Sequence, residues 1–370
     1  MAIEFDQVSK RYPDGTLAVD DLTLTAPSGA ITVFVGPSGC GKTTSLRMIN
    51  RMVDPTSGAI RIDGVDVTAQ PAAQLRRRIG YVIQHAGLFP HRTVVDNVAT
   101  VPVLEGVSRA EARKRAYELL ERVGLSAALA ERYPAQLSGG QQQRVGVARA
   151  LAADPPVMLM DEPFSAVDPV VRESLQAEFL RLQGELGKTI VMVTHDIDEA
   201  IKLGDHVAVF AEGGRLAQVA TPEQLLAAPA DDFVAGFVGR DRGYRGLSFA
   251  TAAELSVEPA GTEVAGLTLV VDDGRPVGWR DGTGRVLASA GAFTAADTLR
   301  AAADLALLSP AGAAVRVGAD GRVDGIVRHA AIAEVIRRRQ VERIAVEGAG
   351  ADDRSDVEGS SELGERVSGA

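Results

Sequence analysis

The chain has 370 residues, enough for two or three domains, since a domain typically holds about 100–200 residues. It carries 39 Lys and Arg residues against 49 Asp and Glu residues, so the net charge is −10. This sign excludes a basic nucleic-acid coat and a polybasic membrane anchor. The single cysteine, Cys40, excludes an internal disulfide and a multi-cysteine metal site, and it indicates a reducing compartment.

The first residues and the uncharged segments predict a cytoplasmic chain without a membrane span. Residues 1–6 lack the basic and apolar regions of a secretory signal. The longest uncharged stretch, residues 22–41, is about long enough to cross a bilayer, but prolines and glycines interrupt it. Any role at a membrane is therefore expected to come through a partner protein.

Residues 1–240 alternate strand-like and helix-like segments, which is typical of an α/β fold. Apolar runs at residues 30–35, 157–160 and 189–194 are bounded by turn residues and predict buried parallel strands. Residues 60–67 instead alternate apolar and polar side chains around Asp-Gly, which predicts an antiparallel hairpin.

Residues 90–150 predict a helical insert in this sheet. Ser108 and Glu111 have the spacing of a capping box at the start of a helix. The helical pattern continues over residues 112–123, and Gly124 stands where a helix C-terminus favours glycine.

A second domain is expected over residues 250–340. Lysine is absent after Lys202, and small residues dominate from residue 250 onward. Residues 271–279 and 318–326 both place Asp-Gly-Arg between strand-like flanks, which indicates either a weak internal repeat or two unrelated hairpin turns. The final segment, residues 346–370, is rich in Gly, Ser, Asp and Glu and is predicted to be a disordered acidic tail.

A phosphate-binding motif follows the first predicted parallel strand. Residues 36–43 match G-x-x-x-x-G-K-[ST] between a strand and a helix, as the motif requires. Its glycines let backbone N–H groups surround a phosphate, Lys42 neutralises phosphate oxygens, and the Thr43 hydroxyl binds Mg²⁺. The expected nucleotide-binding residues are Gly36, Pro37, Ser38, Gly39, Cys40, Gly41, Lys42, Thr43 and Thr44.

Two carboxylates end the apolar strand at residues 157–160. Asp161 is expected to hold Mg²⁺, and Glu162 is expected to polarise the attacking water. Such an ending is common by itself, but together with the phosphate-binding motif it predicts an ATPase.

The segment Leu137-Ser138-Gly139-Gly140-Gln141 opens a further helix. With the two preceding motifs it resembles the signature of ATP-binding cassette (ABC) proteins. Ser138, Gly139, Gly140 and Gln141 would present a hydroxyl and backbone amides to a phosphate at a helix N-terminus.

Four other residues match the cassette pattern, and the resemblance implies their roles. Gln84 would contact Mg²⁺ and the attacking water, and His195 would contact the γ-phosphate and steady Glu162. Asp168 would lie at a subunit interface, and Tyr12 would stack on adenine. The implied catalytic residues are Lys42, Gln84, Glu162 and His195, and the implied metal ligands are Thr43, Gln84 and Asp161.

The resemblance extends over residues 1–245. Residues 84–91, 152–156, 194–200 and 237–242 look like the ATPase subunits of glycine betaine, carnitine and choline importers. ATPase subunits of amino-acid and sulfonate importers share much of this sequence, so these importers remain alternative functions. The resemblance implies a head-to-tail homodimer on the inner face of the membrane, a separate permease, and an extracytoplasmic solute-binding protein.

The expected fold is therefore an α/β cassette with a mixed sheet, an antiparallel β subdomain and a helical signature subdomain. A smaller α+β domain follows it and looks like a degenerate pair of CBS modules. The hydroxyl and aspartate that adenosyl-binding CBS modules tend to present are replaced by Arg280 with Thr283 and by Arg328 with Ala331. We therefore expect no nucleotide sensing there.

The motifs disfavour two other function classes. A cassette ATPase acting on DNA would need a long coiled coil between the phosphate-binding motif and the signature, and one acting on ribosomes would carry two cassettes. The sequence has neither, and no nucleic-acid partner is predicted. A regulatory module with a vestigial cassette would need damaged catalytic motifs, and none is damaged.

Overall fold

A computed structural model of the chain describes residues 1–84, 87–165, 167–239 and 241–339. The chain divides into two compact units, Met1–Arg240 and Asp241–Ala370, and each has hydrophobic clusters of its own. The predicted tail at residues 346–370 lies outside the described residues. Within the described ranges, no helix is both long and apolar enough to cross a membrane.

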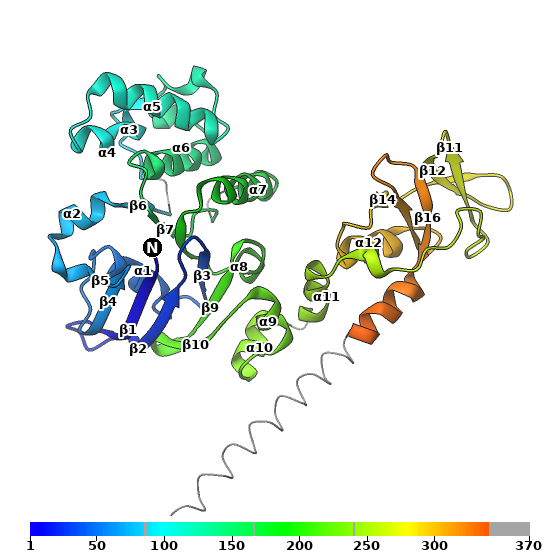
Figure 1. The fold of residues 1–370 in the computed structure, drawn as a ribbon, viewed down its shortest axis with the longest axis horizontal. Coiled ribbons are helices and arrows are strands. Elements are labelled where there is room, and N and C mark those ends of the chain that lie inside the picture. Colours follow the sequence, from blue (N-terminus) through cyan, green and yellow to red (C-terminus); the bar gives the residue numbers. More distant parts are fainter. Residues whose placement is uncertain (85–86, 166, 240, 340–370) are drawn as a thin grey trace, which may run out of the picture. The chain divides into compact units, whose positions relative to one another are not determined.

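A six-stranded mixed sheet forms the centre of the first unit, in the order β10-β9-β3-β8-β7-β6 (Figure 1). Five strands are parallel, and β10 pairs antiparallel with β9. Every residue of β3, β7 and β8 is buried, as expected for parallel strands covered on both faces. The strands are β3 (Ile31–Val35), β6 (Ile79–Val82), β7 (Val157–Asp161), β8 (Thr189–Val193), β9 (His206–Ala211) and β10 (Arg215–Ala220).

An antiparallel sheet in the order β2-β1-β4-β5 packs beside the central sheet. Its strands are β1 (Ile3–Arg11), β2 (Leu17–Ala26), β4 (Ser57–Ile62) and β5 (Val65–Asp66). Asp63 and Gly64 connect β4 to β5 with φ values of 54° and 76°, so the predicted Asp-Gly hairpin is confirmed. Phe34 joins the sheets, because its ring contacts Phe5 at 6.2 Å and Phe210 at 5.1 Å.

Helices cover both faces of the central sheet. Leu46 and Ile49 of α1 pack on one face, whereas Leu175 of α7 and Leu203 of α8 belong to the hydrophobic cluster of the other face. The helices of the first unit outside its helical insert are α1 (Lys42–Ile49), α2 (Ala72–Arg77), α7 (Pro169–Leu186), α8 (Ile197–Leu203), α9 (Pro222–Ala227) and α10 (Asp232–Val238).

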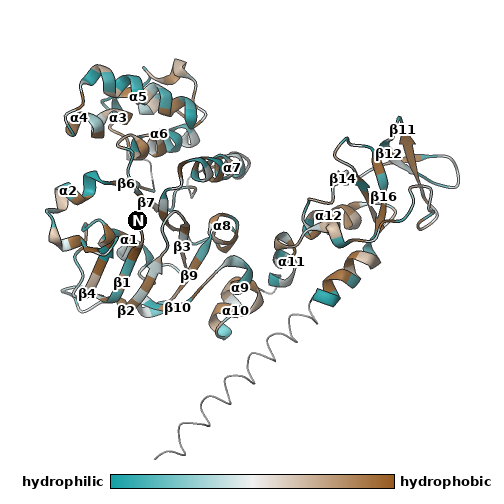
Figure 2. Cartoon of the chain, in the orientation of Figure 1, coloured by the Kyte–Doolittle hydropathy of each residue, from teal (hydrophilic) through white to brown (hydrophobic). Residues whose placement is uncertain are grey.

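A separate helical part is inserted between β6 and β7 and has its own hydrophobic cluster. It contains α3 (Val94–Val98), α4 (Thr100–Leu104), α5 (Arg109–Arg122) and α6 (Gly139–Leu151). In α5 only Ala112, Ala116 and Leu120 are buried, one residue per turn, and the rest of the helix is mainly hydrophilic (Figure 2). The Ser108 hydroxyl accepts a hydrogen bond from the Glu111 N–H, but the Glu111 carboxylate pairs with Arg115, so half of the predicted capping box forms.

The second unit contains two three-stranded sheets, β11-β12-β13 and β14-β15-β16. Both Asp-Gly-Arg segments form hairpin turns, one between β11 and β12 and one between β15 and β16. The two hairpins have different surroundings. Strand β14 and helix α12 precede the second hairpin, whereas β11 of the first hairpin is the first strand of the second unit. The elements are α11 (Arg242–Gly246), β11 (Thr268–Asp272), β12 (Arg275–Arg280), β13 (Val286–Ala288), β14 (Ala292–Phe293), α12 (Leu299–Leu308), β15 (Ala313–Val317), β16 (Val323–Arg328) and a helix at 329–339.

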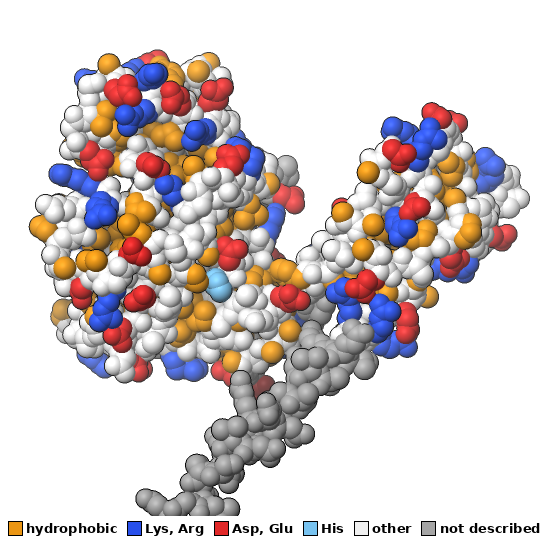
Figure 3. All heavy atoms as spheres, in the orientation of Figure 1, with side chains coloured by type: hydrophobic (Ala, Val, Ile, Leu, Met, Phe, Trp, Pro, Cys, Tyr) orange, Lys and Arg blue, Asp and Glu red, His pale blue; other side chains and the backbone are white. Residues whose placement is uncertain are grey.

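Short 3₁₀ helices complete the connections: η1 (Val67–Ala69), η2 (Ala127–Leu129), η3 (Pro134–Gln136), η4 (Glu212–Gly214), η5 (Leu247–Phe249) and η6 (Ala252–Glu254). On the face drawn in Figure 3, acidic and basic side chains of each unit are interspersed with hydrophobic ones.

Candidate phosphate-binding and catalytic site

The loop between β3 and α1 is shaped by glycines that no other residue can replace without strain. Gly39 and Gly41 have φ values of 81° and 92°, in the left-handed region. A Cβ on Gly41 would lie 2.1 Å from the Ala18 carbonyl oxygen, and one on Gly36 would lie 2.3 Å from that of Phe210. The loop therefore presses against β2 and β9, and its curled backbone is of the kind that surrounds an anion with N–H groups.

Lys42 begins α1 and holds its ammonium group over this loop. The side chain is 6% exposed, and Nζ donates hydrogen bonds of 2.7 Å to the carbonyl oxygens of Gly36 and Pro37. Cys40 is buried, and its Sγ lies 3.5 Å from Nζ. In the described part of the chain the ammonium is paired with neutral acceptors and no carboxylate, so its charge is available to a phosphate.

Two oxygen donors from different elements meet beside the loop. The Thr43 hydroxyl on α1 donates a 3.1 Å hydrogen bond to Oδ1 of Asp161, the last residue of β7. Hydroxyl and carboxylate oxygens are the ligands that Mg²⁺ prefers, so this pair fits a nucleotide-bound Mg²⁺. Arg47, one turn further along α1, places its guanidinium 3.4 Å from Oδ2 of Asp161. Burial and the charge of Asp161 raise the pKa of Tyr81, which interacts with both Arg47 and Asp161.

Two side chains from neighbouring strand ends meet at the Glu162 carboxylate, which itself follows β7. Gln84, which follows β6, donates from Nε2 to Oε2 of Glu162 over 3.0 Å. His195, which follows β8, places Nδ1 at 3.3 Å from the same oxygen. Parallel strands bring their carboxyl ends to one edge of the sheet, which explains this meeting. Glu162 itself has a φ of 47°, a conformation that non-glycine residues adopt rarely and often at functional sites.

Ser138 lies in the helical part and caps α6. Its hydroxyl accepts from the Gln141 N–H at 3.3 Å, and the Gln141 side chain accepts from the Ser138 N–H at 3.0 Å. Gly139 and Gly140 form the first turn of α6. Within the described ranges the hydrogen bonds of Ser138 stay inside this segment, so the structure does not join it to Lys42 in the same chain.

The remaining predicted residues flank the site. Tyr12 lies in the turn between β1 and β2, and its ring carries the Lys10 ammonium at 5.3 Å from the ring centroid. Ser38 and Thr44 are part of the loop and of α1. Asp168 immediately precedes α7, and its carbonyl accepts a 2.8 Å hydrogen bond from the Arg172 N–H.

Arg47 and Tyr81 also lie at the site, although no motif in the sequence names them. A signal for Arg47 exists, because a residue four positions after Thr43 lies on the same face of the helix. Tyr81 carries no comparable signal, since its partners Arg47 and Asp161 come from distant parts of the sequence.

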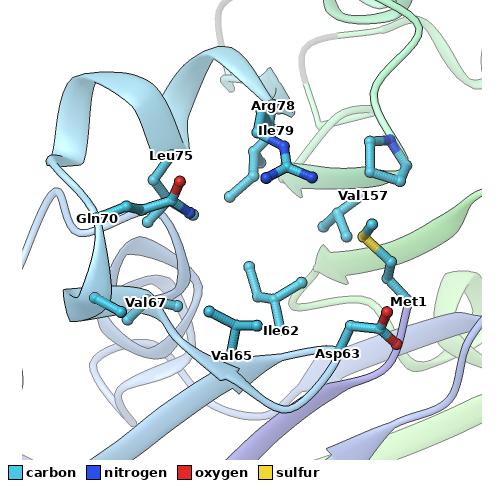
Figure 4. A pocket seen from close by; sticks show the side chains of 12 residues that line it. Met1, Ile62, Asp63, Val65, Val67, Gln70, Leu75, Arg78, Ile79 and Val157 are labelled. Carbon is cyan, nitrogen blue, oxygen red and sulfur yellow. The ribbon is translucent and has the colours of Figure 1, made fainter.

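A cavity in the first unit lies apart from this site (Figure 4). Its volume is about 350 Å³, and its walls are mainly apolar, with contributions from β4, β5, α2 and β6. Arg78 and Asp63 are its charged residues and lie on opposite sides of it. It shares no lining residue with the phosphate-binding loop.

Known proteins that are similar to this chain are ATP-binding proteins of transport systems. A family model described as "ABC transporter" matches residues 19–165. The osmoprotectant import ATP-binding protein OsmV of Salmonella typhimurium is 48% identical over 71% of this chain and 73% of its own length. The glycine betaine/carnitine/choline transport ATP-binding protein OpuCA of Bacillus subtilis is 51% identical over 65% of this chain and 63% of its own length.

A solved structure shows the same fold. The dimeric post-hydrolysis state of the ATP-binding cassette MJ0796, bound to ADP and Pi, is 35% identical with a TM-score of 0.55. The match covers 60% of this chain and 98% of that one. These similarities and the mixed-sheet fold show that the chain belongs to the family of ABC transporter ATP-binding proteins.

Proposed function

We propose that this chain binds ATP and Mg²⁺, hydrolyses ATP in a head-to-tail homodimer, and thereby drives import of a quaternary amine osmoprotectant through a separate membrane permease. The observation that carries the proposal is the meeting of Lys42, Thr43, Asp161, Glu162 and His195 at one edge of the central sheet. Phosphate-binding, metal-binding and water-activating groups are thereby adjacent.

Each residue has a distinct task in this site. The loop N–H groups and Lys42 would hold the phosphates, and Thr43 and Asp161 would hold Mg²⁺, with Gln84 as a further candidate ligand. Bound Mg²⁺ supplies charge neutralisation to the phosphate oxygens. Glu162 accepts a proton from water and orients it, while Gln84 and His195 keep the Glu162 carboxylate in place. The site would then accelerate hydrolysis by positioning the water and by stabilising charge on the phosphates, without a covalent intermediate on the protein.

The position of Ser138 supports a shared site. Its hydroxyl and the N-terminus of α6 form an anion-binding group in the helical part, apart from the residues around Lys42. A second copy arranged head to tail would bring the Ser138 loop of one protomer to the Lys42 loop of the other. Asp168 would then lie at the interface and Tyr12 beside the adenine. The matched MJ0796 structure is described as dimeric, which supports a dimer here.

The transported solute and the partners are proposed from the relatives. OsmV is named for osmoprotectant import and OpuCA for glycine betaine, carnitine and choline transport. We therefore propose a solute of this class, a membrane permease, a solute-binding protein acting on that permease, and a location at the inner face of the membrane. The smaller domain, which we propose over residues 250–340 within the second unit, would act in regulation or assembly.

The proposal is tested with the chain, the permease and the solute-binding protein that co-purify with it, reconstituted in liposomes containing ATP. Glycine betaine, choline and carnitine uptake is compared with uptake of an amino acid and a sulfonate. We expect uptake of a quaternary amine, stimulated by ATP and abolished by Lys42→Ala. Uptake of only an amino acid or a sulfonate would refute the solute class, and ATP-independent uptake would refute the coupling.

A further inference from the structure

Glu199 is a buried carboxylate in α8 that receives hydrogen bonds from two other elements. Its side chain is 6% exposed. The Thr194 hydroxyl, at the end of β8, donates to Oε2 over 2.7 Å, and the Gln176 amide on α7 donates to Oε1 over 3.1 Å. Each carboxylate oxygen therefore holds a different element of the fold.

The bond to Thr194 fixes the backbone next to His195. Thr194 is 2% exposed, and besides donating to Glu199 its hydroxyl accepts from the Asp196 N–H over 3.1 Å. The Asp196 carboxylate in turn caps α8 by accepting from the N–H groups of Asp198 and Glu199. The residues on both sides of His195 are thereby anchored, while the His195 ring stays exposed and reaches Glu162.

The bond to Gln176 connects this segment to α7, the helix that follows Asp168. One turn before Gln176, the Arg172 guanidinium donates to the Val167 carbonyl over 3.1 Å, and its backbone N–H donates to the Asp168 carbonyl. The same helix therefore contacts Glu199 and the loop that contains Asp168. α7 therefore connects the two regions through hydrogen bonds.

The electrostatic surroundings of Glu199 are mixed. Burial raises its pKa, and the charge of Asp196 acts in the same direction. The hydrogen bonds from Thr194 and Gln176 and the charge of Arg172 oppose this rise. Burying a polar group costs free energy that an apolar side chain would not, whereas a satisfied buried network specifies one arrangement of its members. A buried carboxylate whose hydrogen bonds are satisfied therefore indicates that Glu199 positions its partners, Thr194 and Gln176, rather than only stabilising the fold.

We infer that Glu199 is a positioning residue for His195, holding the backbone of the His195 loop through Thr194 and tying that loop to α7 through Gln176. The inference rests on the proposed ATPase function and adds a residue that acts through His195 rather than on the nucleotide.

Steady-state ATP hydrolysis by the full chain tests this role with four variants. Glu199→Ala removes both acceptors, and Thr194→Val removes the hydroxyl at nearly constant volume. Glu199→Gln combined with Gln176→Glu restores a carboxylate–amide pair in the reverse order and still offers Thr194 an acceptor. Glu173→Gln is the matched control, because it breaks an exposed ion pair of 3.9 Å with Lys202 that also links α7 to α8.

We expect Glu199→Ala and Thr194→Val to lower kcat at least about tenfold while the KM for ATP changes less than about twofold, since the residues that hold the phosphates are untouched. The swapped pair should recover kcat to within about threefold of wild type, and Glu173→Gln should match wild type. Circular dichroism establishes that each variant is folded. If Glu199→Ala fails to fold, Thr194→Val and the swapped pair decide the question.

The outcomes separate this inference from the proposed function. Wild-type kcat in Thr194→Val or Glu199→Ala, with an active wild type, would overturn the positioning role alone. A rise in KM that accounts for the loss, or a swapped pair as inactive as Glu199→Ala, would overturn it as well. A wild-type chain that hydrolyses no ATP would overturn the proposed function and the inference that rests on it.

Discussion

Replacing Glu162 by Gln keeps the shape of the side chain and removes its ability to accept a proton. In the structure, Oε2 accepts from Gln84 at 3.0 Å and lies 3.3 Å from His195 Nδ1, so the carboxylate is held by two neighbours. A glutamine offers one acceptor oxygen, and its NH₂ group cannot accept a hydrogen bond from either neighbour.

The size of the effect follows from these contacts. A hydrogen bond to a charged group contributes about 1.5–3 kcal/mol, and a positioned general base contributes about 10²–10⁴-fold in rate. We therefore expect kcat to fall by about 10²-fold or more, which corresponds to at least about 2.7 kcal/mol. ATP binding should persist, because Lys42 and Thr43 are unchanged.

The assay measures phosphate release at saturating ATP, ATP affinity by titration, and oligomeric state by gel filtration with ATP. We expect Glu162→Gln to bind ATP, accumulate as a dimer and release almost no phosphate. Glu173→Gln, an exposed carboxylate of α7, serves as the control for removing one negative charge. Turnover near the wild-type rate in Glu162→Gln would refute the assignment of Glu162 as the water-activating residue.

Three further predictions test the shared site, the second unit and the core. Lys42→Ala and Ser138→Arg variants, each inactive alone, should regain part of the ATPase activity when mixed, because one composite site per heterodimer is intact; a mixture that stays inactive would contradict the head-to-tail arrangement. A chain cut after residue 240 should fold and bind ATP, because the phosphate-binding residues lie in the first unit, whereas α11 and Leu247 pack with the second; residues 241–339 should bind no adenine nucleotide in a calorimetric titration, and micromolar binding would restore a sensor role. Phe34→Ala should lower the free energy of unfolding by about 3–5 kcal/mol in urea denaturation, because its buried ring joins the two sheets; a loss below about 1 kcal/mol would show that the sheets do not depend on it.

The candidate residues of the site and the strands that carry them could be predicted from local patterns in the sequence. The phosphate-binding loop is local, since Gly36 to Thr43 are consecutive and their geometry follows from glycine and from the start of a helix. The buried strands β3, β7 and β8 are continuous apolar runs, which is the pattern of strands covered on both faces. The order of the motifs along the chain then led to the cassette family.

Tertiary structure alone decided which side chains meet. Gln84 and Glu162 are 78 positions apart and share a hydrogen bond because β6 and β7 are parallel neighbours. Glu199 meets Gln176 only because α7 and α8 cover the same face of the sheet. Sequence periodicity shows which face of an element is buried, but it does not show which element packs there. That choice depends on the pairing order of the strands and on the packing of the whole core, so the network behind His195 is visible only in the folded chain.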